Sequence, residues 1–187
     1  MRVAIITESF LPEVNGVVNS VLRVLDHLVD HGHDVLLLAP EAPGAPTQYR
    51  GVPVVPMTSL AFPGYQQVRI CTTPQLALEW TLASFSPDVV HLASPINVGY
   101  RAALAARRLG IPSVAVYQTD VPGYASRYGI PALEAYLWAR VRGTHQAATL
   151  NLAPSSASIA QLEGLGVGDL RLWGRGVDGE LFHPSTR

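Results

Sequence analysis

Three polar segments of the sequence carry the side chains that could do chemistry. The first runs from Glu8 to Gly16 and ends in an Asn-Gly pair ahead of an apolar stretch with helical spacing. Glycine lets an anion approach the backbone closely, and the first turn of a helix offers unpaired N–H groups and positive dipole charge. We therefore expect Asn15 and Gly16 to bind an anionic phosphate. The alternative is that Asn15 caps the helix in an ordinary turn, which an isolated Asn-Gly pair equally fits.

The second and third segments each follow a further apolar run. Ser94 and Asn97 come after the run that contains His91, and either could cap the following helix or contact a ligand. We expect capping, which both residue types favour. A histidine inside an apolar strand is more often a hydrogen-bonded core residue than a catalyst. The third segment, residues 117–124, brings phenol, amide, hydroxyl and carboxylate groups together, which favours a sugar site. Its candidate catalytic residues are Gln118, Thr119 and Asp120.

The sequence lacks the motifs of several other enzyme classes, which argues against a hydrolase, a P-loop protein or a zinc enzyme. There is no GxSxG elbow, Walker A loop, HExxH pair or Cys/His zinc framework. The histidines at 27, 31 and 33 have a near-metal spacing, but no supporting carboxylate or cysteine accompanies them. We expect no metal and no cofactor.

Composition and charge narrow the class of protein further. The 187 residues are 48% hydrophobic and 14% charged, which is enough for one sizeable core. A net charge of −1 and the absence of a basic run argue against a nucleic-acid partner. The single cysteine, Cys71, and the short apolar run before Glu8 favour a cytoplasmic location. No stretch approaches the roughly 18 apolar residues of a membrane span, so we expect any membrane contact to be peripheral.

Strands and helices alternate along the predicted chain, which indicates an α/β fold with a doubly wound, mostly parallel sheet. The loop at 44–51 and the irregular segment at 60–70 interrupt the alternation. The predicted strands cover 3–7, 34–39, 52–57, 88–93, 112–118, 148–153 and 170–173. The predicted helices cover 17–31, 74–84, 98–109, 132–145 and 155–165.

The pattern of the last residues predicts a linker rather than the end of a domain. Residues 174–187 show no periodic pattern and contain Gly, Asp and Pro. We therefore predict a domain over 1–173, an interdomain linker over 174–187 and a second, C-terminal domain outside this sequence.

Several of these segments together resemble glycosyltransferase family four, across essentially the whole chain. The resemblance rests on TESFLP at 7–12 with NGVV at 15–18, PDVVH at 87–91, and GVD at 176–178 followed by Phe182 and Pro184. Through YQTDV at 117–121 and WGRGVD at 173–178, the sequence is most similar to the GDP-mannose-dependent α-mannosyltransferases of membrane lipids.

The resemblance implies half of a retaining GT-B enzyme, whose two Rossmann-like domains face each other across a cleft. The N-terminal domain would hold a lipid or glycolipid acceptor, and the missing domain would hold most of the GDP-mannose donor. Gly16 matches the glycine that binds the donor diphosphate. Many relatives have a histidine where this sequence has Gln118, which suggests positioning rather than proton transfer. The predicted acceptor-binding residues are Glu8, Phe10, Tyr65, Arg69, Tyr124 and Arg127.

The sequence leaves two other interpretations of the function open. A stand-alone Rossmann-like binding module would have the same fold without transfer activity. A flavodoxin-like or dinucleotide-binding regulator is disfavoured because the first loop lacks a clustered glycine fingerprint. For the enzyme, the location is cytoplasmic, with contact at the inner face of the cell membrane as a further hypothesis.

Overall fold

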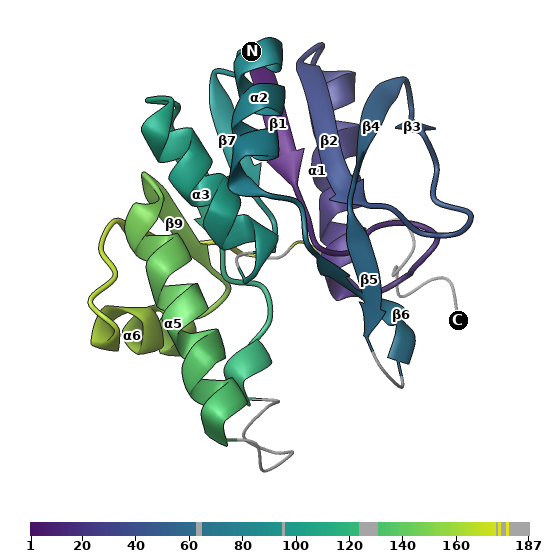
Figure 1. Cartoon of the computed structure of the whole chain (residues 1–187). Coiled ribbons are helices and arrows are strands. Elements are labelled where there is room, and N and C mark those ends of the chain that lie inside the picture. Colours follow the sequence, from purple (N-terminus) through teal and green to yellow (C-terminus); the bar gives the residue numbers. More distant parts are fainter. Residues whose placement is uncertain (63–64, 95, 124–130, 175, 177–178, 180–187) are drawn as a thin grey trace.

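The central sheet has the strand order β10-β9-β8-β7-β1-β2-β4-β3 within the part of the chain that the structure describes. The structure is a computed structural model, shown in Figure 1, and it describes residues 1–62, 65–94, 96–123, 131–174, 176 and 179. The sheet strands are β1 (Arg2–Ile6), β2 (Asp34–Pro40), β3 (Gln48–Tyr49), β4 (Val52–Met57), β7 (Val89–Leu92), β8 (Ser113–Val116), β9 (Leu150–Ala153) and β10 (Leu170–Leu172).

Neighbouring strands run parallel except for β3, which pairs antiparallel with β4 at one edge. β1 lies in the middle, with Ile5 opposite Leu37 of β2 on one side and opposite His91 of β7 on the other. Continuous apolar runs form these central strands because both faces of a parallel sheet are covered by helices. The chain therefore leaves β1 in one direction, returns past it and continues through β7, which makes the ends of β1 and β7 the switch point of the sheet.

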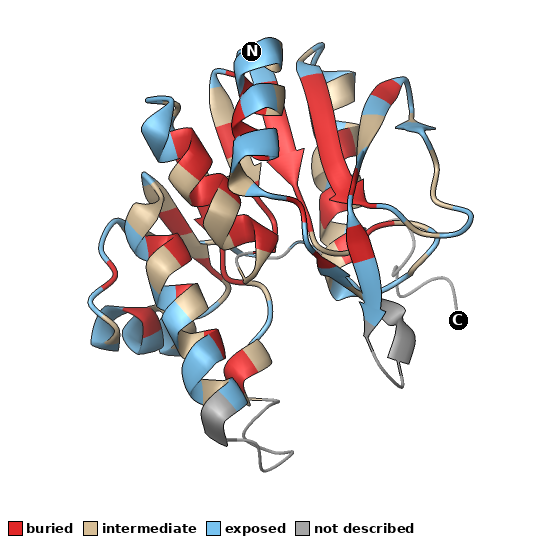
Figure 2. Cartoon of the chain, in the orientation of Figure 1, coloured by how far each residue is buried: buried red, intermediate tan, exposed pale blue. Residues whose placement is uncertain are grey.

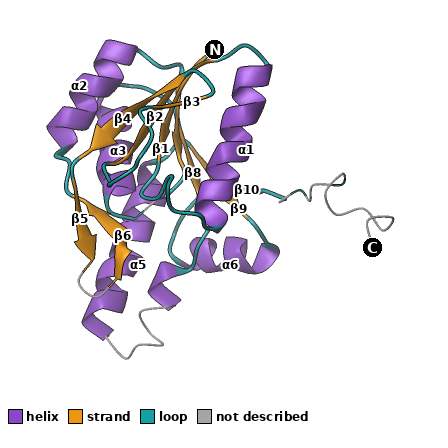
Figure 3. Ribbon diagram, turned by 90° about the vertical axis from the view of Figure 1, so that its right-hand side faces the viewer, coloured by secondary structure: helices purple, strands orange, loops and turns teal. Residues whose placement is uncertain are grey.

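Helices cover both faces of the sheet, as the side view in Figure 3 shows. α1 (Gly16–Asp30) covers one face, while α2 (Gln75–Phe85) and α3 (Val98–Arg108) cover the other. α5 (Pro131–Ala147) packs against α3, and α6 (Ser156–Gly164) packs beside β9 and β10. Among the described residues, no helix is long and apolar enough to cross a membrane.

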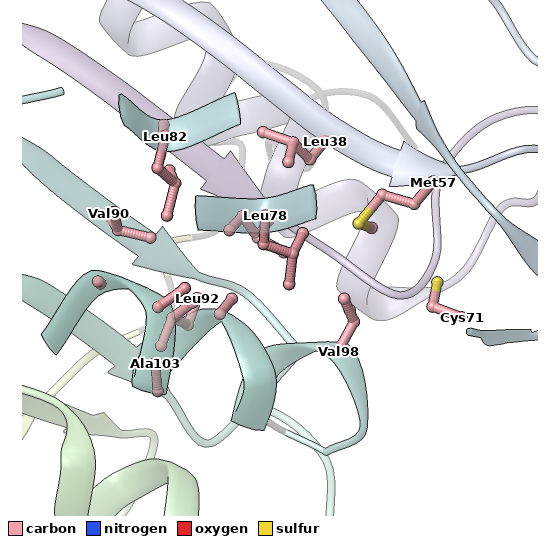
Figure 4. Packing of buried hydrophobic residues seen from close by; sticks show 14 of the residues in the cluster. Leu38, Met57, Cys71, Leu78, Leu82, Val90, Leu92, Val98 and Ala103 are labelled. Atoms are coloured by element: carbon pink, nitrogen blue, oxygen red, sulfur yellow. The ribbon is translucent and has the colours of Figure 1, made fainter. Parts of the chain in front are cut away.

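Buried residues concentrate along the central strands and the inward faces of the helices (Figure 2). Two apolar clusters lie on the two sides of the sheet. On the α2–α3 side, Leu38, Leu78 and Leu92 meet in the packing shown in Figure 4. On the α1 side, Ile5, Val21 and Leu25 are each at most 1% exposed. The sheet is thus fixed on both faces, so the loops at its carboxyl edge project from a rigid base.

The predicted alternation of strands and helices is confirmed, with one segment read wrongly. Residues 60–70 were expected to be irregular, but β5 (Ser59–Phe62) and β6 (Tyr65–Cys71) form an antiparallel hairpin that projects from the sheet (Figure 1). The hairpin carries polar residues on both strands, so it lacks the apolar run by which the sheet strands were found. β3 likewise lies within the loop predicted at 44–51.

Candidate functional site

A cavity of about 600 Å³ opens at the switch point, where β1 and β7 end and their loops diverge. Ligands of open α/β sheets bind in this position. Residues from four segments line it: the loop after β1, the start of α1, the loop after β7 and the segment after β8. Arg69 reaches the same cavity from the β5–β6 hairpin.

The first turn of α1 forms one wall of this cavity. Asn15 caps the helix, with its Oδ1 accepting hydrogen bonds from the N–H groups of Val17 and Val18, both at 3.0 Å. Its Nδ2 donates to Ser9 Oγ at 2.7 Å, so both the oxygen and the nitrogen of the amide help to hold the loop. This geometry favours the capping alternative for Asn15 over a direct contact with phosphate.

Gly16 remains the group that an anion can reach. A Cβ built on Gly16 would meet no heavy atom within 4 Å, and the residue lines the cavity. Its backbone N–H has no hydrogen-bond partner among the described residues and lies at the positive end of the α1 dipole. The first segment can thus offer an anionic ligand one hydrogen-bond donor, the backbone N–H of Gly16.

Glu8 joins the loop after β1 to the start of α3. Its Oε1 accepts from the backbone N–H groups of Asn97 at 2.6 Å, Val98 at 3.0 Å and Gly99 at 3.4 Å. Burial raises the pKa of Glu8 to about 7, although these N–H groups favour the charged form. The prediction that Asn97 caps this helix with its side chain is wrong, because Asn97 Nδ2 donates to the backbone oxygen of Cys71 instead.

The segment after β8 separates the main cavity from a second one of about 420 Å³. Gln118 and Thr119 line both cavities, and Gln118 Nε2 donates to the backbone oxygen of Ala93 at 2.9 Å. The Tyr117 hydroxyl donates to Asp120 Oδ1 at 3.1 Å, and that oxygen also accepts from the N–H of Gly123. Thus Gln118 and Thr119 face the main cavity, while Asp120 lines only the second one.

The predicted acceptor residues are not all in one place. Glu8 and Arg69 line the main cavity, and Arg69 is braced by Ser59, whose Oγ accepts from Nε at 3.0 Å. Phe10 is a correction: its side chain is 4% exposed, belongs to the α1-side core and meets the Tyr49 ring edge-on. The Tyr65 side chain, Tyr124 and Arg127 lie outside the described residues.

Two further polar lining residues were not singled out from the sequence. Ser9 and Glu13 lie in the same loop as Glu8 and Asn15, and both line the main cavity. Their position in the sequence between Glu8 and Asn15, two predicted site residues, could have indicated that they line the site. The buried hydroxyls of Thr7 and Ser94, 3.3 Å apart, join the ends of β1 and β7 beneath the cavity. No group of three or more His, Cys, Asp or Glu that could hold a metal ion occurs within the described part of the chain.

The sequence model of Glycosyltransferase Family 4 matches residues 14–181 of this chain. The chain belongs to glycosyltransferase family 4. Over its whole length it is 48% identical to a GDP-mannose-dependent alpha-mannosyltransferase of Mycobacterium tuberculosis and 44% identical to one of Corynebacterium glutamicum. It is 33% identical to the sulfoquinovosyl transferase SQD2 of Arabidopsis thaliana. The chain covers 50%, 46% and 37% of these three proteins, about half the length of the two mannosyltransferases.

Solved structures share the fold at low sequence identity. HepE from Anabaena, solved in complex with UDP, superposes with a TM-score of 0.68 at 15% identity, over 99% of this chain and 47% of that one. The glycosyltransferase VinC, solved in complex with dTDP, gives 0.51 at 15% identity, over 82% of this chain and 49% of that one. The family 4 chain therefore has the Rossmann-like architecture of the N-terminal half of a GT-B fold, as the sequence predicted.

Proposed function

We propose that this chain is the N-terminal, acceptor-side domain of a retaining glycosyltransferase that transfers mannose from GDP-mannose to a glycolipid. The observation that carries the proposal is the cavity at the switch point, whose lining combines Gly16, in the first turn of α1, with hydrogen-bonding groups suited to a sugar. The similarity of the whole chain to GDP-mannose-dependent alpha-mannosyltransferases supports the donor.

The charge of the cavity supports the proposal of a second, nucleotide-binding domain. Its described lining contains two carboxylates, Glu8 and Glu13, and one guanidinium, Arg69. A nucleoside diphosphate brings about two negative charges of its own, and this lining cannot neutralise them. We therefore assign residues 1–173 to the acceptor-side domain and 174–187 to the connection with a nucleotide-binding domain. Gly16 then completes the diphosphate site from across the cleft.

We assign distinct roles to the residues around the transferred sugar. Gln118 and Thr119 position the mannose by hydrogen bonds, since an amide and a hydroxyl cannot act as strong acids or bases at neutral pH. Asp120 holds this segment through Tyr117 and Gly123. Glu8 and Arg69 contact the acceptor from the opposite side of the cavity.

The lipid acceptor places the protein at the cytoplasmic face of a membrane, and the exposed surface of α2 is suited to peripheral contact. Leu76 and Trp80 lie one helical turn apart and are 62% and 69% exposed. By contrast, the guanidinium of Arg140 on α5 is stacked over the rings of Tyr100 and Tyr136. A Trp80→Ala variant should bind vesicles of acidic phospholipid more weakly than wild type in sedimentation, with Trp173→Ala as the control.

Sugar transfer itself tests the proposal. Radiolabelled GDP-mannose is incubated with a membrane lipid extract and either this 187-residue chain or the longest reading frame that contains it. Label should enter the lipid fraction only with the longer protein, because this domain lacks most of the donor site. If neither protein transfers label, the donor is wrong or the chain is a binding module without transfer activity.

A further inference from the structure

Glu8 uses one carboxylate oxygen for the fold. All three bonds from Asn97, Val98 and Gly99 end on Oε1, so this oxygen caps α3 from a loop 89 residues earlier in the chain. Backbone N–H groups at a helix N-terminus fix both the place and the orientation of a carboxylate. The start of α3 therefore holds the carboxyl group of Glu8 rigidly, although Glu8 lies outside this helix.

The second oxygen is available to the cavity. Glu8 is only half-buried and lines the cavity together with Gly16, Gln118 and Arg69. None of the three capping bonds uses Oε2. The N–H of Ile96 also lies close to the carboxyl group, but its hydrogen bond goes to the backbone oxygen of Ser94, so Oε2 is the oxygen that a ligand can meet. A carboxylate oxygen in that state accepts hydrogen bonds and donates none.

We propose that Oε2 of Glu8 accepts a hydrogen bond from a hydroxyl of the acceptor headgroup and so selects a neutral, hydroxyl-bearing carbohydrate surface at this point of the cavity. This inference rests on the proposed function, because it names what one wall of the acceptor site recognises. The bonded hydroxyl is a neighbour of the attacking one, so Glu8 orients the headgroup and takes no proton during transfer. A phosphate at the same place would be repelled by the carboxylate.

The charge state of Glu8 ties this contact to pH. Burial places the pKa of Glu8 at about 7, so the carboxylate form that accepts a hydrogen bond becomes dominant above that pH. Arg69 and Glu13 line the same cavity, and Arg101 of α3, whose Nη1 donates to the Thr73 backbone oxygen, acts together with Glu8 and Arg69 on the Cys71 thiol. Burial and the charge of Glu8 raise the pKa of the Cys71 thiol to about 12, so Cys71 stays neutral throughout.

The experiment compares Glu8→Gln with wild type in the full-length enzyme, using the labelled lipid extract as acceptor. Glutamine keeps an oxygen for the cap of α3 but replaces the second oxygen with an N–H donor. The apparent KM for the extract should rise about 10- to 100-fold, as expected for the loss of a charged hydrogen bond, with little change in kcat or in the KM for GDP-mannose. Glu163→Gln, on the exposed surface of α6, is the matched control and should behave as wild type.

The pH profile gives a second readout that a purely structural role would not produce. In wild type, kcat/KM for the extract should rise through an ionisation near pH 7, whereas Glu8→Gln should be flat over the same range. The inference is overturned if wild type transfers label and the variant keeps its acceptor KM. Should the variant fail to fold, a wild-type profile without this ionisation overturns it equally. Absence of transfer by wild type would instead count against the proposed function.

Discussion

His145 and Asn151 hold each other in the core, with His145 Nδ1 donating to Asn151 Oδ1 at 2.8 Å. Asn151 Nδ2 also donates to the backbone oxygens of His145 at 3.0 Å and Gly168 at 2.9 Å. These two bonds fix the amide orientation, and the amide orientation in turn fixes the tautomer of the imidazole. The pair fastens the end of α5 to β9 beneath Tyr117, whose ring meets the His145 ring edge-on.

Replacement of Asn151 by leucine should destabilise the fold strongly. The side chain is 1% exposed, so the buried imidazole and backbone oxygen of His145 would both lose their partner, and the exposed backbone oxygen of Gly168 would lose one as well. We expect a loss of about 2–4 kcal/mol in the free energy of unfolding, measured by urea denaturation. Asn19→Leu, the same change at an exposed position of α1, should cost less than about 0.5 kcal/mol. Equal losses for the two variants would show that the buried network contributes nothing of its own.

The same histidine should make stability depend on pH. Burial lowers the pKa of His145 from 6.5 to about 4, so the unfolded chain binds a proton at higher pH than the folded chain does. The contribution of His145 to stability is therefore complete above pH 6.5 and decreases as the pH falls toward 4. The maximum slope is about 1.4 kcal/mol per pH unit.

A difference measurement isolates this contribution. Burial also lowers the pKa of His91 to about 4, so His91 reduces stability at low pH as His145 does. The raised pKa of Glu8 has the opposite effect on the pH dependence of stability. Both cancel when the unfolding free energy of His145→Gln is subtracted from that of wild type at each pH. The difference should shrink by about 1 kcal/mol between pH 7 and pH 5.5. A constant difference would mean that His145 titrates normally in the fold.

The packing of α3 on α5 depends on a glycine. A Cβ at Gly143 would lie 2.5 Å from Cε2 of the Tyr100 ring, which is also covered by the Arg140 guanidinium. The clash in Gly143→Ala should outweigh the gain of about 1 kcal/mol that alanine brings to a helix, with a net loss of about 1 kcal/mol. Gly164→Ala, in α6 with no heavy atom within 4 Å, should not be destabilised. Thermal unfolding of the two variants provides the comparison.

Much of the fold could be predicted because its main strands and helices have clear local sequence patterns. β4 was located at its observed bounds, and α1 and α3 to within one residue, from apolar runs and from helical periodicity. The β5–β6 hairpin could not be found this way, because β5 is only four residues long and Gln66, Gln67 and Arg69 interrupt the apolar residues of β6. Ser59 Oγ joins the hairpin to the segment after β2 by donating to the Glu41 backbone oxygen, and it also accepts from Arg69 Nε; such pairing is not visible in any one segment alone.

The site was predictable in outline and not in its internal contacts. The loops at the carboxyl ends of β1, β7 and β8 were nominated from the strand pattern, and residues from all three line one cavity. The cap of α3 was misassigned because Glu8 comes from a distant loop, whereas sequence rules for capping look only at adjacent residues. Phe10 was misplaced because a strand end marks a loop as exposed, while this loop turns one aromatic side chain back into the core.

Gly16 offers the most direct test of the donor side. A side chain there would extend into the open cavity, since no atom lies within 4 Å of its Cβ and its backbone needs no glycine-specific conformation. Gly16→Trp should therefore leave the unfolding free energy within about 0.5 kcal/mol of wild type. In the full-length enzyme it should reduce transfer from GDP-mannose by at least about 100-fold, because the indole would occupy the place of the diphosphate. Gly164→Trp, equally open but at the end of α6, should retain transfer. A Gly16→Trp enzyme that folds and transfers at the wild-type rate would remove the phosphate from this end of α1 and leave the cavity to the acceptor alone.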